Sequence, residues 1–325
     1  MRPLGAGLIN QTFLVEGASC GKFVLQRLHS IFPPEVNEDI EAVTRHLAAR
    51  GQVTPRLLRT ASGALWVQSE GVWRALSWVE GVGLDRLERP AQAREAGRAL
   101  AAFHRAVGDL QHEFRSRRLG VHDTARHLAA LRGALAAHRG HRRFAAVEPL
   151  ALEILDAGDA LAPLPPLPAR IVHGDPKLNN ILFSPDGARA ICLIDLDTLT
   201  DMALPLELGD AFRSWCNPAG EDRSRASFSM ELFAAAIEGY AGGVAGFITA
   251  GEWRSIVPAI ETIYVELAAR FCADALNESY FGWNPQEFPG RSEHNQVRAE
   301  SQLHALRSLR SQREPAAAAV AAAFS

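Results

Sequence analysis

The chain contains the stretch His173-Gly174-Asp175-Pro176-Lys177-Leu178-Asn179-Asn180 and, shortly after it, Ile194-Asp195-Leu196-Asp197. Between them, apolar runs flank Ser184-Pro185-Asp186-Gly187, whose proline and glycine suit a tight reversal. This pattern predicts a β-hairpin. Such a hairpin would bring Asn180 and Asp195 close together at one end of its two strands, although they are distant in sequence.

The first stretch has the pattern H-x-D-x-K-x-x-N, which supplies the groups that phosphoryl transfer needs. That reaction depends on positioning and charge neutralisation, so it needs a base, metal ligands and a cation. Asp175 can orient or deprotonate an attacking hydroxyl, and Lys177 can face the migrating phosphoryl group. Asn180 and Asp195 offer oxygen ligands for Mg²⁺. We expect His173 to hydrogen-bond the backbone and hold Asp175 in place. The candidate catalytic residues are therefore Asp175, Lys177 and His173.

Lys177 is one of two lysines in the chain, the other being Lys22, and arginine supplies nearly every other cation. A lysine at the cationic position of the motif is therefore informative. A compact ammonium suits a phosphate as a point charge, whereas a forked guanidinium requires another geometry. The alternative is an ordinary hairpin whose loop carries solvated charges.

The composition is ordinary for a globular protein, with 47% hydrophobic and 22% charged residues. A formal net charge of -3 gives no electrostatic reason to expect binding to nucleic acid or to an anionic membrane. No apolar run approaches the roughly 18 residues that span a bilayer, and no signal-peptide pattern is visible. The widely spaced cysteines favour free thiols in a reducing cytosol, hence a cytoplasmic protein. They are Cys20, Cys192, Cys216 and Cys272.

The order of the expected elements predicts an α+β, protein-kinase-like fold with two lobes. Residues 1–80 read as a small antiparallel-sheet N-lobe with one helix, which would bind the nucleotide. Residues 81–325 read as a larger, mainly helical C-lobe with the catalytic loop, metal site and acceptor pocket. The chain would cross between the lobes at 76–81, where the backbone of Trp78 and Val79 could hydrogen-bond an adenine edge.

Periodicity and turn residues give approximate bounds for these elements. The N-lobe helix is expected at 38–49, and the Ala-rich tail from 314 to 325 is expected to fray. The expected N-lobe strands are 12–15, 22–27, 64–67 and 72–76. The expected C-lobe helices are 91–107, 125–138, 147–161, 224–239, 252–276 and 293–309.

The N-terminus carries a candidate phosphate loop. Gly5 and Gly7 would let backbone N–H groups approach phosphates, and Asn10 lies just after them. The pattern is weaker than G-x-G-x-x-G, and the strand before it is expected to be very short or absent. We include these three residues in the predicted nucleotide site.

Arg27 ends an expected strand where kinases of this architecture carry a cation over the nucleotide phosphates. We expect it to pair with Glu41 of the following helix; Glu38, one turn earlier, is the alternative. Because alternate strand residues face opposite sides, only one of Gln26 and Arg27 can face the nucleotide, and the sequence leaves open which. The alternative is a solvated arginine at the end of the strand and a solvated glutamate on the helix.

Further stretches match a known family. The motif, the downstream aspartate and the lobe order resemble the aminoglycoside phosphotransferase and choline kinase superfamily, and the chain looks most like its N-acetylhexosamine 1-kinases. The resemblance implies ATP- and Mg²⁺-dependent phosphorylation of a sugar, at the anomeric hydroxyl in the closest relatives. The matching segments are LINQT at 8–12, FVLQR at 23–27, IFP at 31–33, residues 37–44, IDLDT at 194–198 and ELGDAFR at 207–213.

The resemblance also assigns roles by position. It implies that Asp175 is the base, that Asn180 and Asp195 are metal ligands, and that Lys177 contacts phosphate. Asp197 would add a second metal contact or support the first.

The acceptor should bind after the metal aspartate, where Glu207, Asp210 and Arg213 look like a polar rim for sugar hydroxyls. Alternatively, Asp210 and Arg213 form an ion pair at the start of a helix, and Trp215 belongs to the core. The sequence does not decide between these interpretations.

Other acceptors stay open. Residues 201–300 hold fifteen carboxylates against seven arginines and no lysine, an excess that favours a cationic acceptor such as an aminoglycoside. Homoserine and methylthioribose are further alternatives, as is choline, which would need an aromatic box. The candidate aromatic residues are Trp215, Tyr264, Tyr280, Phe281 and Trp283.

Two other classes are disfavoured. A catalytically silent, nucleotide-binding pseudokinase would lose Asp175, Asn180 or Asp195, and all three are present. Protein kinases carry activation-loop and A-P-E signatures that are absent after Asp195. The sequence does not determine the oligomeric state.

Overall fold

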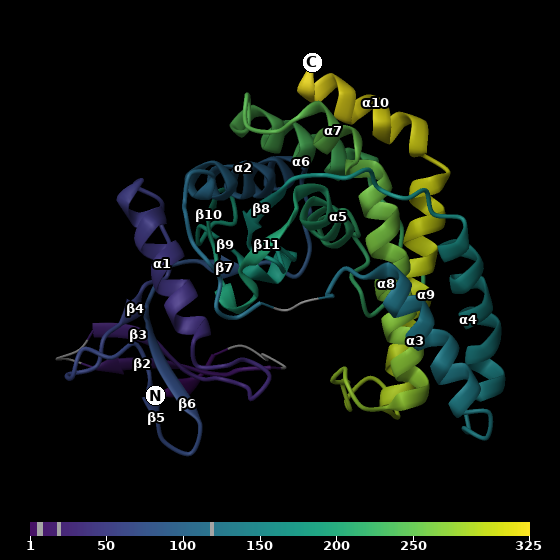
Figure 1. Cartoon of the computed structure of the whole chain (residues 1–325), viewed down its shortest axis with the longest axis horizontal. Coiled ribbons are helices and arrows are strands. Elements are labelled where there is room, and N and C mark those ends of the chain that lie inside the picture. The colour runs from purple at the N-terminus through teal and green to yellow at the C-terminus, as the bar shows by residue number, and fades with distance from the viewer. Residues whose placement is uncertain (5–8, 18–20, 118–119) are drawn as a thin grey trace.

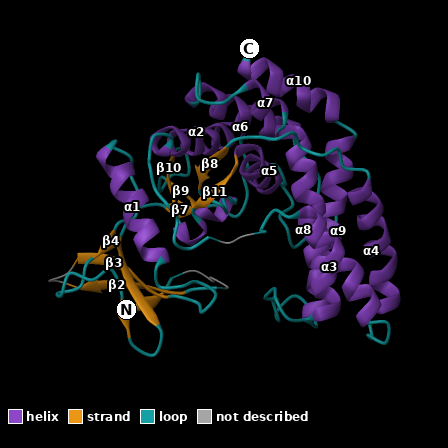
Figure 2. Ribbon diagram, viewed as in Figure 1, coloured by secondary structure: helices purple, strands orange, loops and turns teal. Residues whose placement is uncertain are grey.

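The computed structural model describes residues 1–4, 9–17, 21–117 and 120–325. An antiparallel sheet and helix α1 (Val36–Ala49) occupy one end of the molecule, and helices fill most of the remainder (Figures 1 and 2). Along the sheet the strand order is β1-β2-β3-β6-β4, with β5 also paired to β6. Its strands are β1 (Arg2–Pro3), β2 (Gln11–Gly17), β3 (Gly21–Arg27), β4 (Leu57–Leu58), β5 (Val67–Gln68) and β6 (Val72–Ser77). The first strand is thus present but two residues long.

Helix α1 follows from a clear apolar stripe. Val36, Ile40, Val43 and Leu47 recur at helical spacing and are buried together. Burying each of these side chains contributes about 2 kcal/mol, so the stripe fixes how the helix packs.

The predicted hairpin lies in the middle of the molecule. Strands β9 (Ile181–Phe183) and β10 (Ala190–Leu193) pair antiparallel, and β7 (Val82–Gly83) extends this second sheet beside β9. Strand β8 (Ala169–Val172), which leads into the motif, pairs with β11 (Thr200–Ala203) instead. The chain passes from the first sheet at Ser77 to the second at Val82.

Helices make up most of the remaining chain, so the predicted α+β class, with a small antiparallel sheet followed by a larger, mainly helical part, is confirmed. Two short 3₁₀ turns are present, Leu178–Asn180 at the end of the motif and Leu196–Thr198 directly after Asp195. The helices are α2 (Pro90–Val107), α3 (Thr124–Ala137), α4 (Phe144–Asp159), α5 (Leu204–Trp215), α6 (Met230–Gly243), α7 (Ala250–Arg254), α8 (Ile256–Asn277), α9 (Arg291–Arg310) and α10 (Arg313–Phe324).

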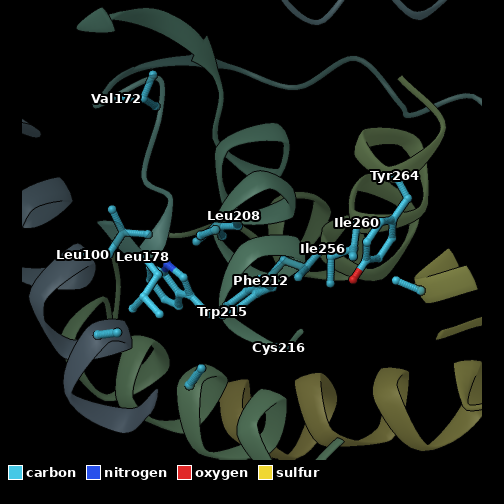
Figure 3. Packing of buried hydrophobic residues seen from close by; sticks show 14 of the residues in the cluster. Leu100, Val172, Leu178, Leu208, Phe212, Trp215, Cys216, Ile256, Ile260 and Tyr264 are labelled. Carbon is cyan, nitrogen blue, oxygen red and sulfur yellow. The ribbon is translucent and has the colours of Figure 1, made fainter. Parts of the chain in front are cut away.

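Helix α5 lies within the core, and Figure 3 shows its packing. Phe212 and Trp215 meet edge to face with ring centroids 5.7 Å apart, and Ile256 and Ile260 of α8 lie beside them. Trp215 also lies next to Leu178 of the motif. The core therefore extends directly beneath the residues that carry the chemistry.

Several predicted bounds were wrong. The helix expected at 252–276 is divided at Ser255 into α7 and α8. The helix expected from 224 begins at Met230, because the Ser229 hydroxyl caps it by accepting the Leu232 amide. The tail is helical as α10, since Phe324 stacks on Trp253 at 5.9 Å and α10 buries two further side chains. The strand expected at 64–67 shortens to Val67–Gln68.

Within the described residues, no helix combines the length and the apolar character needed to cross a membrane.

Cys192, Cys216 and Cys272 are buried free thiols, as expected, and Cys20 lies outside the described residues. Burial raises the pKa of Cys192 to about 12, which makes it a poor nucleophile.

Candidate active site

The motif loop, residues 173–180, lies between β8 and β9 and contacts a second loop, residues 194–198, which we name the Asp195 loop. Gly174 has φ +83°, and a Cβ there would lie 2.1 Å from the Thr198 carbonyl oxygen. Only glycine fits this position. Thr198 Oγ1 donates to the His173 carbonyl oxygen at 2.9 Å, and the Ile194 amide donates to the Asn180 carbonyl oxygen at 2.9 Å. The two loops are therefore bound to each other.

His173 is buried and braces both loops. Its Nε2 donates to the Ile194 carbonyl oxygen at 2.8 Å, and its Nδ1 accepts the Asp175 amide at 3.3 Å. This is the backbone-holding arrangement expected from the sequence, and it ties the ring to the backbone of Asp175 and of Ile194.

Asp175, Lys177 and Asn180 form a compact cluster that solvent reaches. Lys177 Nζ lies 2.6 Å from Asp175 Oδ2, with 41% and 28% of the two side chains exposed. Asn180 Nδ2 donates to the Asp175 carbonyl oxygen at 2.8 Å. Burial raises the pKa of Asp175, but the Lys177 ammonium outweighs it and holds that pKa below its ordinary value. Burial lowers the pKa of Lys177, but Asp175 outweighs it and raises that pKa. Both groups are thus charged at neutral pH.

Asp195 is exposed, and its backbone has φ +63°, a left-handed conformation that costs energy for an aspartate. Desolvation and then the carboxylates of Asp197 and Asp175 raise its pKa. A cation beside Asp195 would offset this crowding of negative charge. Because the Asn180 amide nitrogen is engaged by Asp175, its Oδ1 is the atom left for a cation, and these residues fit a Mg²⁺ ion that keeps water or phosphate ligands.

No group of three or more His, Cys, Asp or Glu side chains converges as metal ligands in the described part of the chain.

The prediction that Asp197 contacts metal is not supported by its surroundings. Its side chain is 1% exposed, with Oδ1 2.5 Å from Arg74 Nη1 and Oδ2 3.0 Å from Arg74 Nη2. Asn10 Nδ2 also donates to Oδ2, at 2.5 Å. Both oxygens are therefore used within the protein.

The predicted pairing of Arg27 with Glu41 is wrong. Arg27 donates to the Glu70 carbonyl oxygen and lies 6.0 Å over the Trp73 ring, whereas Glu41 pairs with Arg59 at 2.9 Å. The alternative partner, Glu38, pairs instead with Arg115.

Of the two candidates on β3, Gln26 faces the interior. Its register partner on β6 is Arg74, and its Oε1 accepts from Arg74 Nε at 2.9 Å and Nη2 at 2.7 Å. The sequence reading missed Arg74. The signal that could have found it is its position directly opposite Gln26 once β3 and β6 are paired in register.

The other predicted nucleotide residues have mixed outcomes. The Asn10 side chain is buried, because its Oδ1 accepts the His29 amide at 2.9 Å while its Nδ2 binds Asp197, so the structure places it in a protein network. Trp78 and Val79 lie on the crossing between β6 and β7. Gly5 and Gly7 lie outside the described residues.

Helix α5 supports the motif loop from below. Glu207 is 1% exposed, and its Oε1 accepts the amides of His173 at 2.8 Å and Gly174 at 3.1 Å. His104 of α2, which the sequence reading also missed, binds the other oxygen at 2.8 Å. The predicted substrate contact of Glu207 is therefore wrong, since no part of its carboxylate is left for a ligand.

The same helix supports the loop at two further points. Trp215 Nε1 donates to the Pro176 carbonyl oxygen at 2.9 Å, and Ser214 Oγ accepts the Leu178 amide at 3.1 Å. Trp215 is fully buried, as the core interpretation predicted.

Asp210 and Arg213 form the ion pair that the sequence offered as the alternative, although the pair lies in the second half of α5 rather than at a helix start. Arg213 Nη2 lies 2.8 Å from Asp210 Oδ1, and its Nη1 lies 2.8 Å from Glu221 Oε1. The Asp210 carboxylate lies close enough to Lys177 to help raise the pKa of that lysine. The Arg213 guanidinium likewise helps to lower the pKa of Asp175. Arg213 is thus held in place, while Asp210 Oδ2 has no hydrogen-bond partner among the described residues.

Comparison with known proteins identifies the fold and the family. The profile of the phosphotransferase enzyme family matches residues 1–245. An aminoglycoside phosphotransferase from Alicyclobacillus acidocaldarius has TM-score 0.59 at 18% identity, covering 94% of this chain and 93% of its own. A choline kinase from Cryptosporidium parvum has TM-score 0.60 at 14% identity, covering 96% and 90%. Amicoumacin kinase in complex with AMP-PNP, Ca²⁺ and Ami has TM-score 0.60 at 11% identity, covering 92% and 86%. At these identities the solved structures show the shared kinase-like fold.

Proposed function

The chain belongs to the phosphotransferase enzyme family, and we propose that it transfers a phosphoryl group from ATP to a hydroxyl of a small neutral sugar, using Mg²⁺. The observation that carries this proposal is the convergence of Asp175, Lys177, Asn180 and Asp195 from two interlocked loops. A carboxylate, an ammonium and two oxygen ligands at one place are the parts that phosphoryl transfer uses.

In this proposal Asp175 accepts a hydrogen bond from the attacking hydroxyl. Because Lys177 depresses its pKa, Asp175 is a weak base, and its main task is orientation. The transition state of phosphoryl transfer is loose, so the hydroxyl proton need not leave early. Asp175 takes that proton as the new oxygen–phosphorus bond forms and the hydroxyl becomes acidic.

Lys177 supplies positive charge beside the reacting centre. Its pKa is raised, so it stays protonated, and 41% of its side chain is exposed. An incoming phosphoryl oxygen can share the ammonium with Asp175. This arrangement would bring the donor phosphate and the acceptor hydroxyl to neighbouring atoms of one ion pair.

Asn180 and Asp195 would hold the metal. When bound, Mg²⁺ neutralises phosphate charge and polarises the phosphoryl oxygens. The Asn180 Oδ1, which has no hydrogen-bond partner among the described residues, and the exposed Asp195 carboxylate, whose pKa desolvation and then nearby carboxylates raise, are the groups suited to it. The backbone of Trp78 and Val79, on the crossing to β7, is the proposed contact for the adenine edge.

A neutral acceptor is favoured because most carboxylates of residues 201–300 already have cationic partners. Asp210 and Glu221 pair with Arg213, and Asp222 with Arg298. Further pairs link Glu261 to Arg310 and Arg313, Glu293 to Arg142, Glu252 to Arg170, Glu238 to Arg94, Asp201 to Arg117, and Glu287 to Arg223. The acidic excess seen in the sequence is thus largely compensated, which weakens the case for a polycation.

The acceptor contacts that remain are Asp210 and Arg213. A carboxylate with one free oxygen beside a fixed guanidinium suits vicinal sugar hydroxyls, and we propose an N-acetylhexosamine phosphorylated at its anomeric hydroxyl. For choline, two aromatic candidates are already used, since Trp215 binds Pro176 and Tyr264 is buried with its hydroxyl toward the Arg213 carbonyl oxygen.

The test is ADP release from MgATP with N-acetylglucosamine, N-acetylgalactosamine, simple hexoses, kanamycin and choline, each compared with Asp175→Asn. Turnover on an acetylated hexosamine that Asp175→Asn abolishes would support the proposal. Turnover on kanamycin alone would replace the sugar with an aminoglycoside. Binding of MgATP without turnover on any compound would contradict the acceptor assignment, and absence of MgATP binding would contradict the kinase assignment.

A further inference from the structure

Arg74 is the most completely bound cation around the site. Its Nε and Nη2 donate to Gln26 Oε1, its Nη1 and Nη2 donate to Asp197, and its Nη1 also reaches Asn37 Oδ1 at 3.4 Å. A guanidinium has five N–H groups, and these contacts use all of them. Arg74 therefore has no N–H left for a phosphate.

The network joins two distant parts of the fold. Arg74 lies on β6, Gln26 on β3, Asn37 on α1, and Asn10 just before β2. All of these belong to the N-terminal sheet or its helix, whereas Asp197 belongs to the Asp195 loop beside the hairpin. One buried carboxylate thus connects the sheet to the loop that carries the proposed metal ligand.

On β3, the residue that faces the interior is the neutral Gln26 rather than Arg27. Arg27 points to Glu70 and Trp73, and Gln26 directs its amide oxygen toward Arg74. The positive charge lies one strand further along, on β6, and it neutralises Asp197. Its effect on a nucleotide must therefore pass through the Asp195 loop.

We propose that the Arg74–Asp197 pair is a positioning lock that fixes the Asp195 loop against the N-terminal sheet and so sets the nucleotide–metal site. This inference rests on the proposed function. With Arg74 in place, Asp197 is held at two oxygens, and Asp195, two residues earlier, is kept in its left-handed conformation. Asn10 extends the lock to the end of the predicted phosphate loop. Arg74 is a positioning residue, since it acts through Asp197.

The test must separate positioning from folding. Removing one charge leaves the other buried and unpaired, which can unfold the protein, whereas replacing a buried ion pair with apolar residues is often tolerated. We therefore choose Arg74→Met/Asp197→Leu, with Asp197→Asn as a second variant that keeps the side-chain shape. The matched control is Arg170→Met/Glu252→Leu, a second ion pair, which joins β8 to α7 and has no member in the N-terminal sheet or the Asp195 loop.

The readouts are the Kd for MgADP by calorimetry and amide hydrogen exchange of 195–199 and 11–17 without ligand. For the double variant we expect a Kd raised about 10- to 100-fold, as for other residues that orient metal ligands, and faster exchange in both segments. Asp197→Asn should give a smaller change in the same direction, and the control pair should stay within about twofold of wild type.

A double variant that binds MgADP like wild type and shows unchanged exchange at 195–199 would overturn the lock. If wild type binds no MgADP, the proposed function fails, and the exchange comparison alone decides the lock. Faster exchange at 195–199 in the double variant, but not in the control pair, would then support it, and equal exchange would overturn it.

Discussion

The motif loop and the Asp195 loop contact each other, yet different parts of the protein hold them. Helix α5 supports the motif loop through the buried Glu207 and Trp215 and the half-buried Ser214. The Asp195 loop is tied through Asp197 to Arg74 and Asn10 of the N-terminal region. The loop that would orient the acceptor is thus part of the rigid core, whereas the loop that would bind metal depends on how the sheet docks.

This difference separates two kinds of sensitivity. Changes beneath the motif loop should lower the stability of the whole protein, because they remove hydrogen bonds at its core. Changes in the Arg74–Asp197 lock should act mainly on nucleotide and metal binding. Variants in each region can therefore show whether the separation is real.

The largest expected effect is that of Asp175→Asn on turnover. Losing the carboxylate removes orientation and proton acceptance, which together are worth about 10²- to 10⁴-fold in kcat, while MgATP binding and the unfolding midpoint should change little. Steady-state ADP release measures kcat, and thermal unfolding measures the unfolding midpoint. Asp186→Asn, in the exposed turn of the hairpin, is the control. A kcat within about twofold of wild type would exclude Asp175 as the orienting group.

Glu207→Ala tests the core side of the comparison. It leaves the amides of His173 and Gly174 and the His104 ring without their acceptor, and each buried unsatisfied group costs about 1–3 kcal/mol. We expect a loss of at least about 3 kcal/mol in the free energy of unfolding, measured with urea. Glu207→Gln, which keeps one oxygen, should lose less. A stability equal to wild type would mean that α5 does not anchor the loop.

Asp210→Asn tests the acceptor side with a smaller effect. Its free Oδ2 would bind a sugar hydroxyl as a charged acceptor, and such hydrogen bonds contribute about 1.5–3 kcal/mol. We expect the acceptor KM to rise about tenfold or more while the ATP KM stays constant. The measurement is initial rate against each substrate in turn, with Glu238→Gln on the exposed face of α6 as control. Equal changes in both KM values would argue against a specific acceptor contact.

The sequence was sufficient for the hairpin and for the groups that it brings together. Apolar runs around a Pro- and Gly-containing turn are local signals, and antiparallel pairing then places Asn180 near Asp195. Leu193 opposite Ile181 confirms that register. The proposed chemistry follows from residues that are close in sequence or linked by one tight turn.

The Arg74–Asp197 pair could not be predicted in the same way. Its partners are 123 residues apart and meet only when the sheet docks beside the Asp195 loop. The prediction that Glu207 contacts the substrate was wrong for another reason. Helix α5 is buried on nearly every side, so the spacing of apolar residues does not show which polar side chain faces inward. Glu207 and Asp210 look alike in sequence, but only Glu207 has both oxygens occupied by the protein.

The smallest predicted effect concerns the second ion pair, Arg170–Glu252, in which Glu252 is buried and Arg170 is partly exposed. It tests whether such pairs stabilise the fold without affecting the site. Burial raises the pKa of Glu252, but its hydrogen bonds with Arg170 and Thr249 outweigh burial and lower that pKa. The stabilisation is therefore complete above the unfolded pKa of about 4.3 and is lost as the pH falls through the lower, folded value.

Glu252→Gln should accordingly lower the free energy of unfolding by about 1 kcal/mol at pH 7, the difference between charge-assisted and neutral hydrogen bonds. The difference in the free energy of unfolding between variant and wild type should become smaller as the pH falls below about 4.3. Urea unfolding at several pH values between 3 and 7 measures this difference. The MgADP affinity of both proteins is measured at pH 7. A gap independent of pH would exclude the charge of Glu252 as the cause. A weaker MgADP affinity would show that ion pairs outside the Asp195 loop also set the nucleotide site, and the contrast between the two loops would then be lost.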